Sequence, residues 1–212
     1  MNRGPERTIY DDALVNPHNR YGWKDKEGPV VPKTSGLGAP TLTAYRGGNV
    51  REFAFAAGDD YDYRFHIPHD WAPGTDMLIH VHWSHNGTNI SGSLVMNHYI
   101  TYAKGHGQAG VSGSAFHAEK NITQTIASLN ITNTPQYLHR VDEVPLMTNG
   151  GSASLLDTSL IEVDGLIIGH FDVTTIPTIT GGAGKPFIHF IDLHYQVDRF
   201  ATRRKSPNFY DE

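Results

Sequence analysis

The sequence contains no cysteine among its 212 residues, so the fold cannot depend on disulfide bonds and no site can use a thiolate. Charged residues make up only 18% of the chain, which favours a surface that partners cover in part. No apolar run approaches the ~18 residues of a membrane helix, and we expect no membrane contact. No apolar core follows residues 1–7, so we expect no signal peptide.

The net charge of −5 at pH 7 argues against nucleic-acid binding by the protein as a whole. One short basic cluster lies near the C-terminus, at residues 199–205, and acidic residues flank it. Histidine is unusually frequent, with 13 residues. We hypothesise that histidine protonation tunes assembly; an oligomer distribution unchanged between about pH 5.5 and 8 would contradict this.

The pattern divides the chain into three parts. Residues 1–47 are rich in proline and glycine and show no regular period, which predicts an extended N-terminal arm over this domain or a neighbouring subunit. Residues 48–198 hold the alternating apolar segments and form the predicted core domain. Residues 199–212 form a charged C-terminal tail.

Within the core domain, the apolar periodicity is that of β-strands. We expect strands in the segments 52–55, 61–66, 78–83, 91–103, 115–131, 137–144, 159–173 and 187–197. Turn signals separate them, for example Asn86-Gly87, and no amphipathic helix is evident. The predicted fold class is therefore all-β, an antiparallel β-sandwich and specifically a jelly roll.

The strand at 78–83 carries the most informative pattern. Side chains alternate across a strand, so His80 and His82 point to one face, and Ile79, Val81 and Trp83 point to the other. Such a pair can hold a metal ion or can form the polar wall of a strand that is buried between subunits. We favour the second interpretation.

Three further residues could complete a metal site with His80 and His82: His98, Asp192 and His194. Asp192 and His194 lie two apart in the strand at 187–197, and two histidines with a carboxylate form the set that small barrels of the cupin type use. Cupins follow their His-x-His with a glutamate, however, and residues 84–89 supply no carboxylate. We therefore predict no metal, no cofactor and no catalytic residue. Of the five residues, His80, His82, Asp192 and His194 are kept as the metal candidates, and His98 is not.

Other catalytic patterns are weaker still. Glu162 and Asp164 are two apart on a predicted strand and could pair for acid/base chemistry, but a solvated sheet edge explains them as well. No nucleophile elbow is present. The glycine-rich segment 181–186 ends in lysine and proline without a following helix, so it is read as a hairpin loop and not as a phosphate-binding loop.

Three segments together resemble virion proteins of tailed bacteriophages that have an all-β fold. These are residues 10–14, the run Pro-His-x-Trp-x-x-Gly-Thr-Asp at 68–76 that leads into His-x-His-Trp at 80–83, and the closing His-Tyr-Gln-x-Asp at 194–198. The resemblance implies a particle component without enzymatic activity, made in the bacterial cytoplasm and located in the virion. It transfers no functional residue.

From this resemblance we predict a non-enzymatic structural protein, a capsid decoration or cement protein that stabilises the particle. Its expected partners are the major capsid protein or portal and tail proteins, and it is expected to form a homo-oligomer, specifically a trimer. The alternatives are a neck or tail attachment protein, a receptor- or carbohydrate-binding protein that stacks sugars on Trp23 or Trp71, and a cupin-like metal-dependent enzyme.

Overall fold

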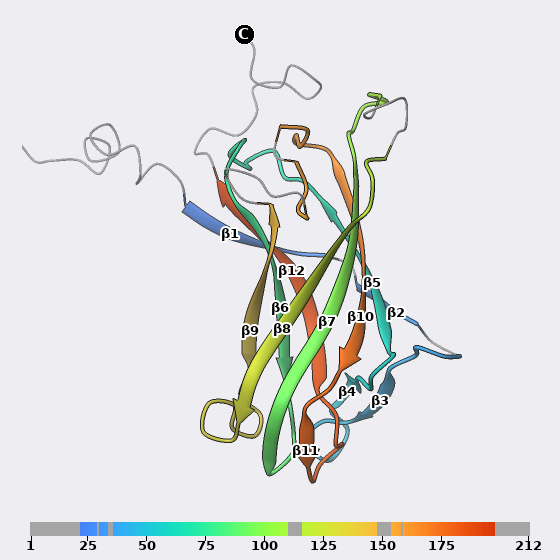
Figure 1. The fold of residues 1–212 in the computed structure, drawn as a ribbon, viewed down its shortest axis with the longest axis vertical. Coiled ribbons are helices and arrows are strands. Elements are labelled where there is room, and N and C mark those ends of the chain that lie inside the picture. The colour runs from blue at the N-terminus through green and yellow to red at the C-terminus, as the bar shows by residue number, and fades with distance from the viewer. Residues whose placement is uncertain are drawn as a thin grey trace, which may run out of the picture.

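The structure is a computed structural model that describes residues 22–28, 30–33, 36–109, 116–147, 154–157 and 159–197. The described residues form twelve strands and no helix (Figure 1). The strands are β1 (Gly22–Glu27), β2 (Val30–Pro32), β3 (Thr41–Ala44), β4 (Arg51–Ala54), β5 (Asp60–His66), β6 (Met77–Ser84), β7 (Asn89–Ala103), β8 (Lys120–Asn130), β9 (Arg140–Met147), β10 (Leu166–Thr175), β11 (Thr178–Thr180) and β12 (Phe187–Val197).

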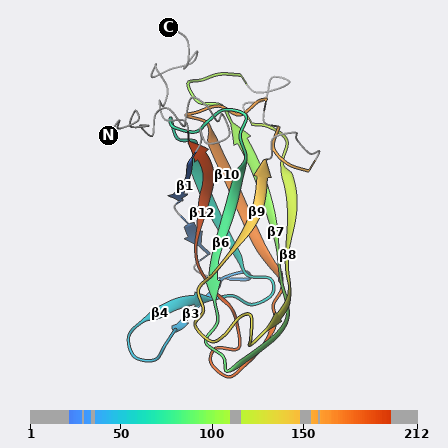
Figure 2. The same ribbon diagram turned by 90° about the vertical axis from the view of Figure 1, so that its left-hand side faces the viewer.

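The strands form two antiparallel sheets that pack face to face (Figure 2). Sheet A has the order β3-β4-β12-β6-β9, and β1 also pairs with β12. Sheet B has the order β8-β7-β10-β5-β2, and β11 pairs with β7 beyond the end of β10. Of the eight principal strands, from β4 to β10 and β12, sheet A takes the first, eighth, third and sixth, and sheet B takes the second, seventh, fourth and fifth. This is the order of a jelly roll, and the predicted fold class is confirmed.

The strands follow the alternation that the sequence shows. In β5 and β8, exposed and buried residues alternate along the strand, because each strand has one face on the core and one in water. The predicted strand 187–197 coincides with β12, whereas β10 begins seven residues later than predicted, at Leu166. Residues 159–165 form turns and irregular backbone and not a strand.

Part of the predicted N-terminal arm pairs with both sheets. β1 pairs with β12 of sheet A, and β2 pairs with β5 of sheet B, so the chain crosses one side of the sandwich between them. The crossing residue Gly28 is buried, and a Cβ there would lie 2.4 Å from the Phe65 ring, which only glycine avoids. The domain boundaries at 47 and 198 stay predictions, and residues 1–21 and 198–212 lie outside the described part.

The core fills the space between the sheets. From sheet A, β6 contributes the inward side chains that the sequence predicts, Ile79, Val81 and Trp83, all fully buried. Trp71, which the sequence suggested as a sugar-stacking residue, is also fully buried. Because its ring has no exposed face, that suggestion is wrong.

In the described part of the chain, no helix is long and apolar enough to cross a membrane.

A β-bulge in β12 interrupts the alternation of its two faces. Strict alternation places His189 on the same face as Ile191 and places Ile188 opposite. The pairing of β12 with β6 shifts between Ile188 and Phe190, so one extra residue is inserted. Ile188 therefore packs in the core with Ile191, and His189 contacts Ser84, on the side away from the core.

The glycines that flank residues 166–168 do not mark a bulge. The irregularity of β10 lies between Val173 and Thr175. A Cβ on Gly169 would lie 2.2 Å from the Tyr63 ring, and one on Gly165 would lie 2.4 Å from the Tyr102 ring. These glycines make room for buried tyrosines, which periodicity alone does not reveal.

Candidate functional site

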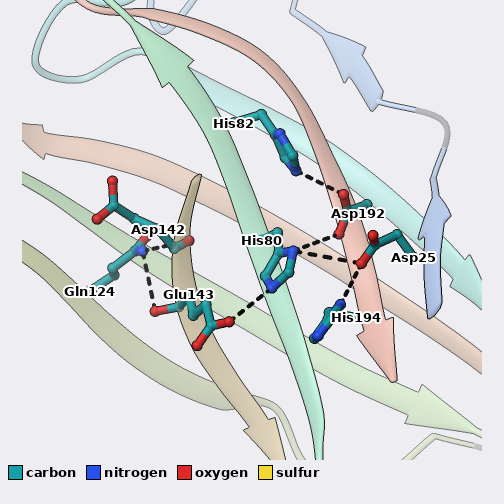
Figure 3. A network of polar contacts seen from close by, with 8 residues as sticks. All are labelled: Asp25, His80, His82, Gln124, Asp142, Glu143, Asp192 and His194. Carbon is teal, nitrogen blue, oxygen red and sulfur yellow. Dashed lines mark hydrogen bonds and ion pairs between the residues drawn. The ribbon is translucent and has the colours of Figure 1, made fainter. Parts of the chain in front are cut away.

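The outer face of sheet A gathers most of the predicted metal candidates. Because β6 and β12 are hydrogen-bonded neighbours, His80 lies opposite Asp192 (Figure 3). His194 lies opposite Leu78. The prediction that His80 and His82 share a face is confirmed, since both contact Asp192 on the side away from the core. We call His80, His82 and Asp192 the His–Asp cluster.

Asp192 is the centre of the His–Asp cluster. Only 4% of this residue is exposed. Its Oδ2 accepts a hydrogen bond from Nε2 of His82 at 2.8 Å. Nδ1 of His80 lies 3.3 Å from Oδ1, but the contact lacks hydrogen-bond geometry, and Oδ1 has no hydrogen-bond partner. A buried carboxylate oxygen without a donor is uncommon and costs stability.

Each histidine of the His–Asp cluster is also held in place through the ring nitrogen that does not contact Asp192. Nε2 of His80 donates to Glu143 of β9 at 3.1 Å, and Nδ1 of His82 lies 2.9 Å from Nε2 of His139. Burial lowers the pKa of His82, against the opposing effect of Asp192, and burial raises the pKa of Asp192 despite the two histidines. The low-polarity surroundings thus disfavour the charged forms of both groups.

The hydrogen bonds define which nitrogen of His80 carries a proton. An ionised Glu143 can only accept, so Nε2 of His80 must be the donor. In a neutral imidazole, Nδ1 then presents a lone pair, and Nδ1 lies 3.3 Å from Oδ1 of Asp192. Two acceptor atoms at this distance repel each other unless a proton or a cation lies between them.

Strand β1 extends the site along the sheet. Asp25 bonds to Nδ1 of His194 and lies 3.7 Å from Nδ1 of His80. The ring of His194 stacks between those of His80, at 4.2 Å between centroids, and Trp23, at 4.5 Å and nearly parallel. We call these three rings the ring stack. Trp23 at its outer end is 44% exposed.

A Ser–His–Glu row lies further along the same face. Oγ of Ser84 is 2.9 Å from Nε2 of His189, and Nδ1 of His189 is 3.5 Å from Glu52. These contacts have the order of a nucleophile, a base and an acid. Ser84 is fully buried, however, and its oxygen also contacts the Tyr45 hydroxyl at 2.9 Å. A substrate carbonyl cannot reach it, so this row ties the β3–β4 hairpin to the sheet.

The structure separates His98 from the other candidates. It lies on β7 in sheet B, points into the core and is fully buried beside the Tyr63 hydroxyl and Gln124. Burial lowers its pKa to about 4. The suggestion that His98 shares a site with His80 is therefore wrong, because the two residues face different sides of different sheets.

Glu162 and Asp164 do not form a strand pair. They lie in the turn before β10, where Asp164 has a positive φ of 60°. Asp164 instead collects three imidazoles, at 2.9 Å from His66, 2.8 Å from His69 and 2.7 Å from His106. Burial opposes ionisation, but the hydrogen bond from His106 and the nearby His69 lower the pKa of Asp164. We call this group the Asp164 cluster.

Several residues of the site escaped the sequence reasoning. Asp25 falls in the predicted arm, and Glu143 and His139 lie near one another in a segment that was examined only for strand pattern. His189 was assigned to the core face. In β9, Val141 lies opposite His82 of β6, and Glu143 lies opposite His80. The sequence does not reveal these pairs unless it is already known that β6 and β9 are neighbours.

No family model matches the chain, and no curated protein matches its sequence. Among solved structures, it is similar to a family 11 carbohydrate-binding module from Clostridium thermocellum in complex with a β-1,3-1,4-mixed-linked tetrasaccharide, at 12% identity and a TM-score of 0.30 over 91% of this chain and 93% of that chain. A second match is TmCBM61 in complex with β-1,4-galactotriose, at 10% identity and a TM-score of 0.26 over 83% of this chain and 84% of that chain. Similarity at this level carries no inference about this chain, whose fold follows from its own strand order.

Proposed function

We propose that this protein is a non-catalytic binding module that recognises a carbohydrate on the outer face of sheet A. The observation that carries the proposal is the state of Trp23, a residue that is 44% exposed and whose ring is nevertheless held parallel to that of His194. Of the three tryptophans in the chain, Trp71 and Trp83 are fully buried. An exposed and oriented indole on a sheet face is a stacking surface for the apolar face of a sugar ring.

The ring stack supplies preorganisation. His194 is fixed by its bond to Asp25 and by its stacking on His80, and His80 is fixed in turn by Glu143. A ligand that stacks on Trp23 therefore has little side-chain entropy to remove, and this lowers the cost of binding.

Polar groups around the ring stack suit sugar hydroxyls. The side chains of Asp25 and Glu143 are 58% and 59% exposed, and both carboxylates can accept hydrogen bonds from hydroxyl groups. Sugars present hydroxyl donors at their edges and C–H groups on their faces. The combination of an indole face with flanking carboxylates matches both surfaces of such a ligand.

The geometry supports binding more than catalysis. The Ser84–His189–Glu52 row is sealed by the burial of Ser84. The Asp192 carboxylate, whose pKa burial raises, is only 4% exposed and contacts two histidines, so a glycosidic bond cannot reach it. Glycoside hydrolysis needs two carboxyl groups that flank a reachable bond.

A glycan array followed by titration tests the proposal. The full chain should bind at least one oligosaccharide class, and ligand should change the fluorescence of Trp23, while buried Trp71 and Trp83 respond little. Trp23→Ala should weaken binding by about 5- to 150-fold, since stacking contributes on the order of 1–3 kcal/mol. Leu42→Ala, at an equally exposed apolar residue on β3, is the matched control and should bind normally. An array without a binder, or an unchanged affinity of Trp23→Ala, would overturn the proposal.

The virion role is a separate prediction, because it concerns the location and the protein partners of the chain and not the ligand that it binds. The predicted location in a phage particle, the trimer and the capsid or tail partners are not tested by the fold. Native mass spectrometry of the purified chain measures the oligomer directly. A trimer would support the prediction, and a monomer would contradict it.

A further inference from the structure

We infer that His80, His82 and Asp192 form a binding site for one divalent transition-metal ion, with Zn²⁺ as the reference ion. This inference does not depend on sugar binding. Two strands position the three ligands: β6 presents both histidines, and β12 presents the aspartate directly opposite His80. The ligand atoms of the three residues all lie within 4.8 Å of one another (Figure 3).

The donor set suits such an ion. Two imidazole nitrogens and one carboxylate oxygen are the ligands that Zn²⁺ and its first-row neighbours accept. At bond lengths of about 2.1 Å, tetrahedral ligands lie on the order of 3.4 Å apart. Nδ1 of His80 and Oδ1 of Asp192 are 3.3 Å apart, so small side-chain rotations suffice to place both on one ion.

The unpaired oxygen is the second and independent observation. Oδ1 of Asp192 is buried, has no hydrogen-bond donor and lies 3.3 Å from Nδ1 of His80. A cation between the two atoms removes this conflict. A proton on either atom would also fill the gap, and titration with Zn²⁺ distinguishes an ion from a proton.

The outer contacts of the histidines match those of metal ligands. Histidines that bind metals usually donate from the other ring nitrogen to a carboxylate, a carbonyl or another acceptor. Glu143 accepts from Nε2 of His80 in this way. For His82, the hydrogen bond between Nδ1 and His139 can reverse its direction, which frees Nε2 to coordinate the ion while Nδ1 keeps a proton.

The fourth position faces β1. Asp25 lies 3.7 Å from Nδ1 of His80, at the edge of the cluster, and can approach the ion directly or through water. Because His80 also stacks on His194, an ion on His80 would stiffen the ring stack that ends in Trp23. The site thus joins three strands, β1, β6 and β12, on the outer face of sheet A.

The test is titration of the chelator-treated full chain with Zn²⁺ and with Co²⁺. We expect one ion per chain with a submicromolar Kd, and visible Co²⁺ absorption bands that report nitrogen and oxygen ligands. Asp192→Asn and His82→Gln should weaken binding at least about 100-fold, and Glu143→Gln, at an exposed side chain that only positions His80, about tenfold. With 13 histidines in the chain, a control is essential. His170→Ala, on the outer face of sheet B, should leave the Kd unchanged.

Each outcome decides the inference. Absence of a stoichiometric ion at neutral pH would overturn it and would assign the gap to a proton. Binding that survives in Asp192→Asn with the wild-type Kd would also overturn it, because the ion would then sit on other histidines. Near-ultraviolet circular dichroism checks that each variant is folded, and Glu143→Gln keeps the test valid if a ligand variant does not fold. Sugar titration of the metal-free protein is scored separately, so failure of either proposal is distinguishable.

Discussion

Two carboxylates in this molecule are surrounded by histidines, and they differ in how fully they are satisfied. Asp164 receives imidazoles on both oxygens, from His66, His69 and His106. Asp192 receives one hydrogen bond, from His82, and its other oxygen has none although it is more deeply buried. Asp164 lies in a turn where several loops meet, whereas Asp192 lies on β12, which is paired with β6.

The difference separates a structural tie from a binding site. A fully satisfied carboxylate stabilises the segments that donate to it, here the end of β5, the loop that follows it, and the loop that contains His106. A buried carboxylate that lacks a donor costs stability and keeps coordinating capacity. Proteins commonly accept such a cost at functional sites.

The largest effect is expected when the satisfied carboxylate is removed. Asp164→Ala should lower the free energy of unfolding by about 3 kcal/mol, since the charge-assisted hydrogen bond from His106, of about 1.5–3 kcal/mol, and the contacts with His66 and His69 are lost and do not add fully. Urea unfolding at pH 7 measures this. Asp62→Ala, which removes an exposed carboxylate that pairs with a single histidine, serves as the control. A loss for Asp164→Ala no larger than that of the control would break the comparison.

Acid should reveal a third group, His98, before it affects Asp164. Burial lowers the pKa of His98 from 6.5 to about 4, so the unfolded state takes up a proton that the folded state does not. The stability from neutral His98 is complete above about pH 6.5 and is lost as the pH falls toward 4, by about 3 kcal/mol in total. The lowered pKa of Asp164 places its own loss at lower pH still.

Unfolding free energies measured from pH 7 to pH 4 check this order. His98→Gln, which can keep a hydrogen bond to Gln124, should lose less stability over that range than the wild type. Equal losses in the two proteins would show that His98 is not the group responsible.

Replacing Asp192, the unsatisfied carboxylate, should change the free energy of unfolding in the opposite direction to replacing Asp164. In the metal-free protein, Asp192→Asn can still accept from His82 through its oxygen, while its amide donates to Nδ1 of His80. We expect the free energy of unfolding to rise by about 1 kcal/mol, measured by urea unfolding. A loss of more than about 2 kcal/mol would mean that Asp192 is a structural tie like Asp164.

The smallest effect is expected for a histidine–carboxylate pair in water. His170 contacts Asp62 at 2.9 Å on the outer face of sheet B, and both side chains are well exposed. His170→Ala should change the free energy of unfolding by less than about 0.5 kcal/mol, because surface ion pairs contribute little. A larger change in the free energy of unfolding would show that the distance between the contacting atoms, and not their burial, determines how much each histidine–carboxylate pair stabilises the protein.

The sequence was informative where a strand has one face in the core. Period-two alternation correctly placed His80 and His82 opposite Val81, and it correctly bounded the strand 187–197. It failed at His189, because a bulge inserts one residue and reverses the faces. It also failed for Trp71, since a tryptophan in a polar loop sequence reads as exposed until the packing is known.

By itself, the sequence determined an all-β sandwich without disulfides, and a strand that directs two histidines away from its core. These properties depend on local alternation and composition, which act over a few residues. Only the tertiary structure brought Asp192 opposite His80, Asp25 beside His194, and three histidines around Asp164. Such contacts join residues far apart in the chain, and strand order and register, set by packing of the whole sandwich, decide them.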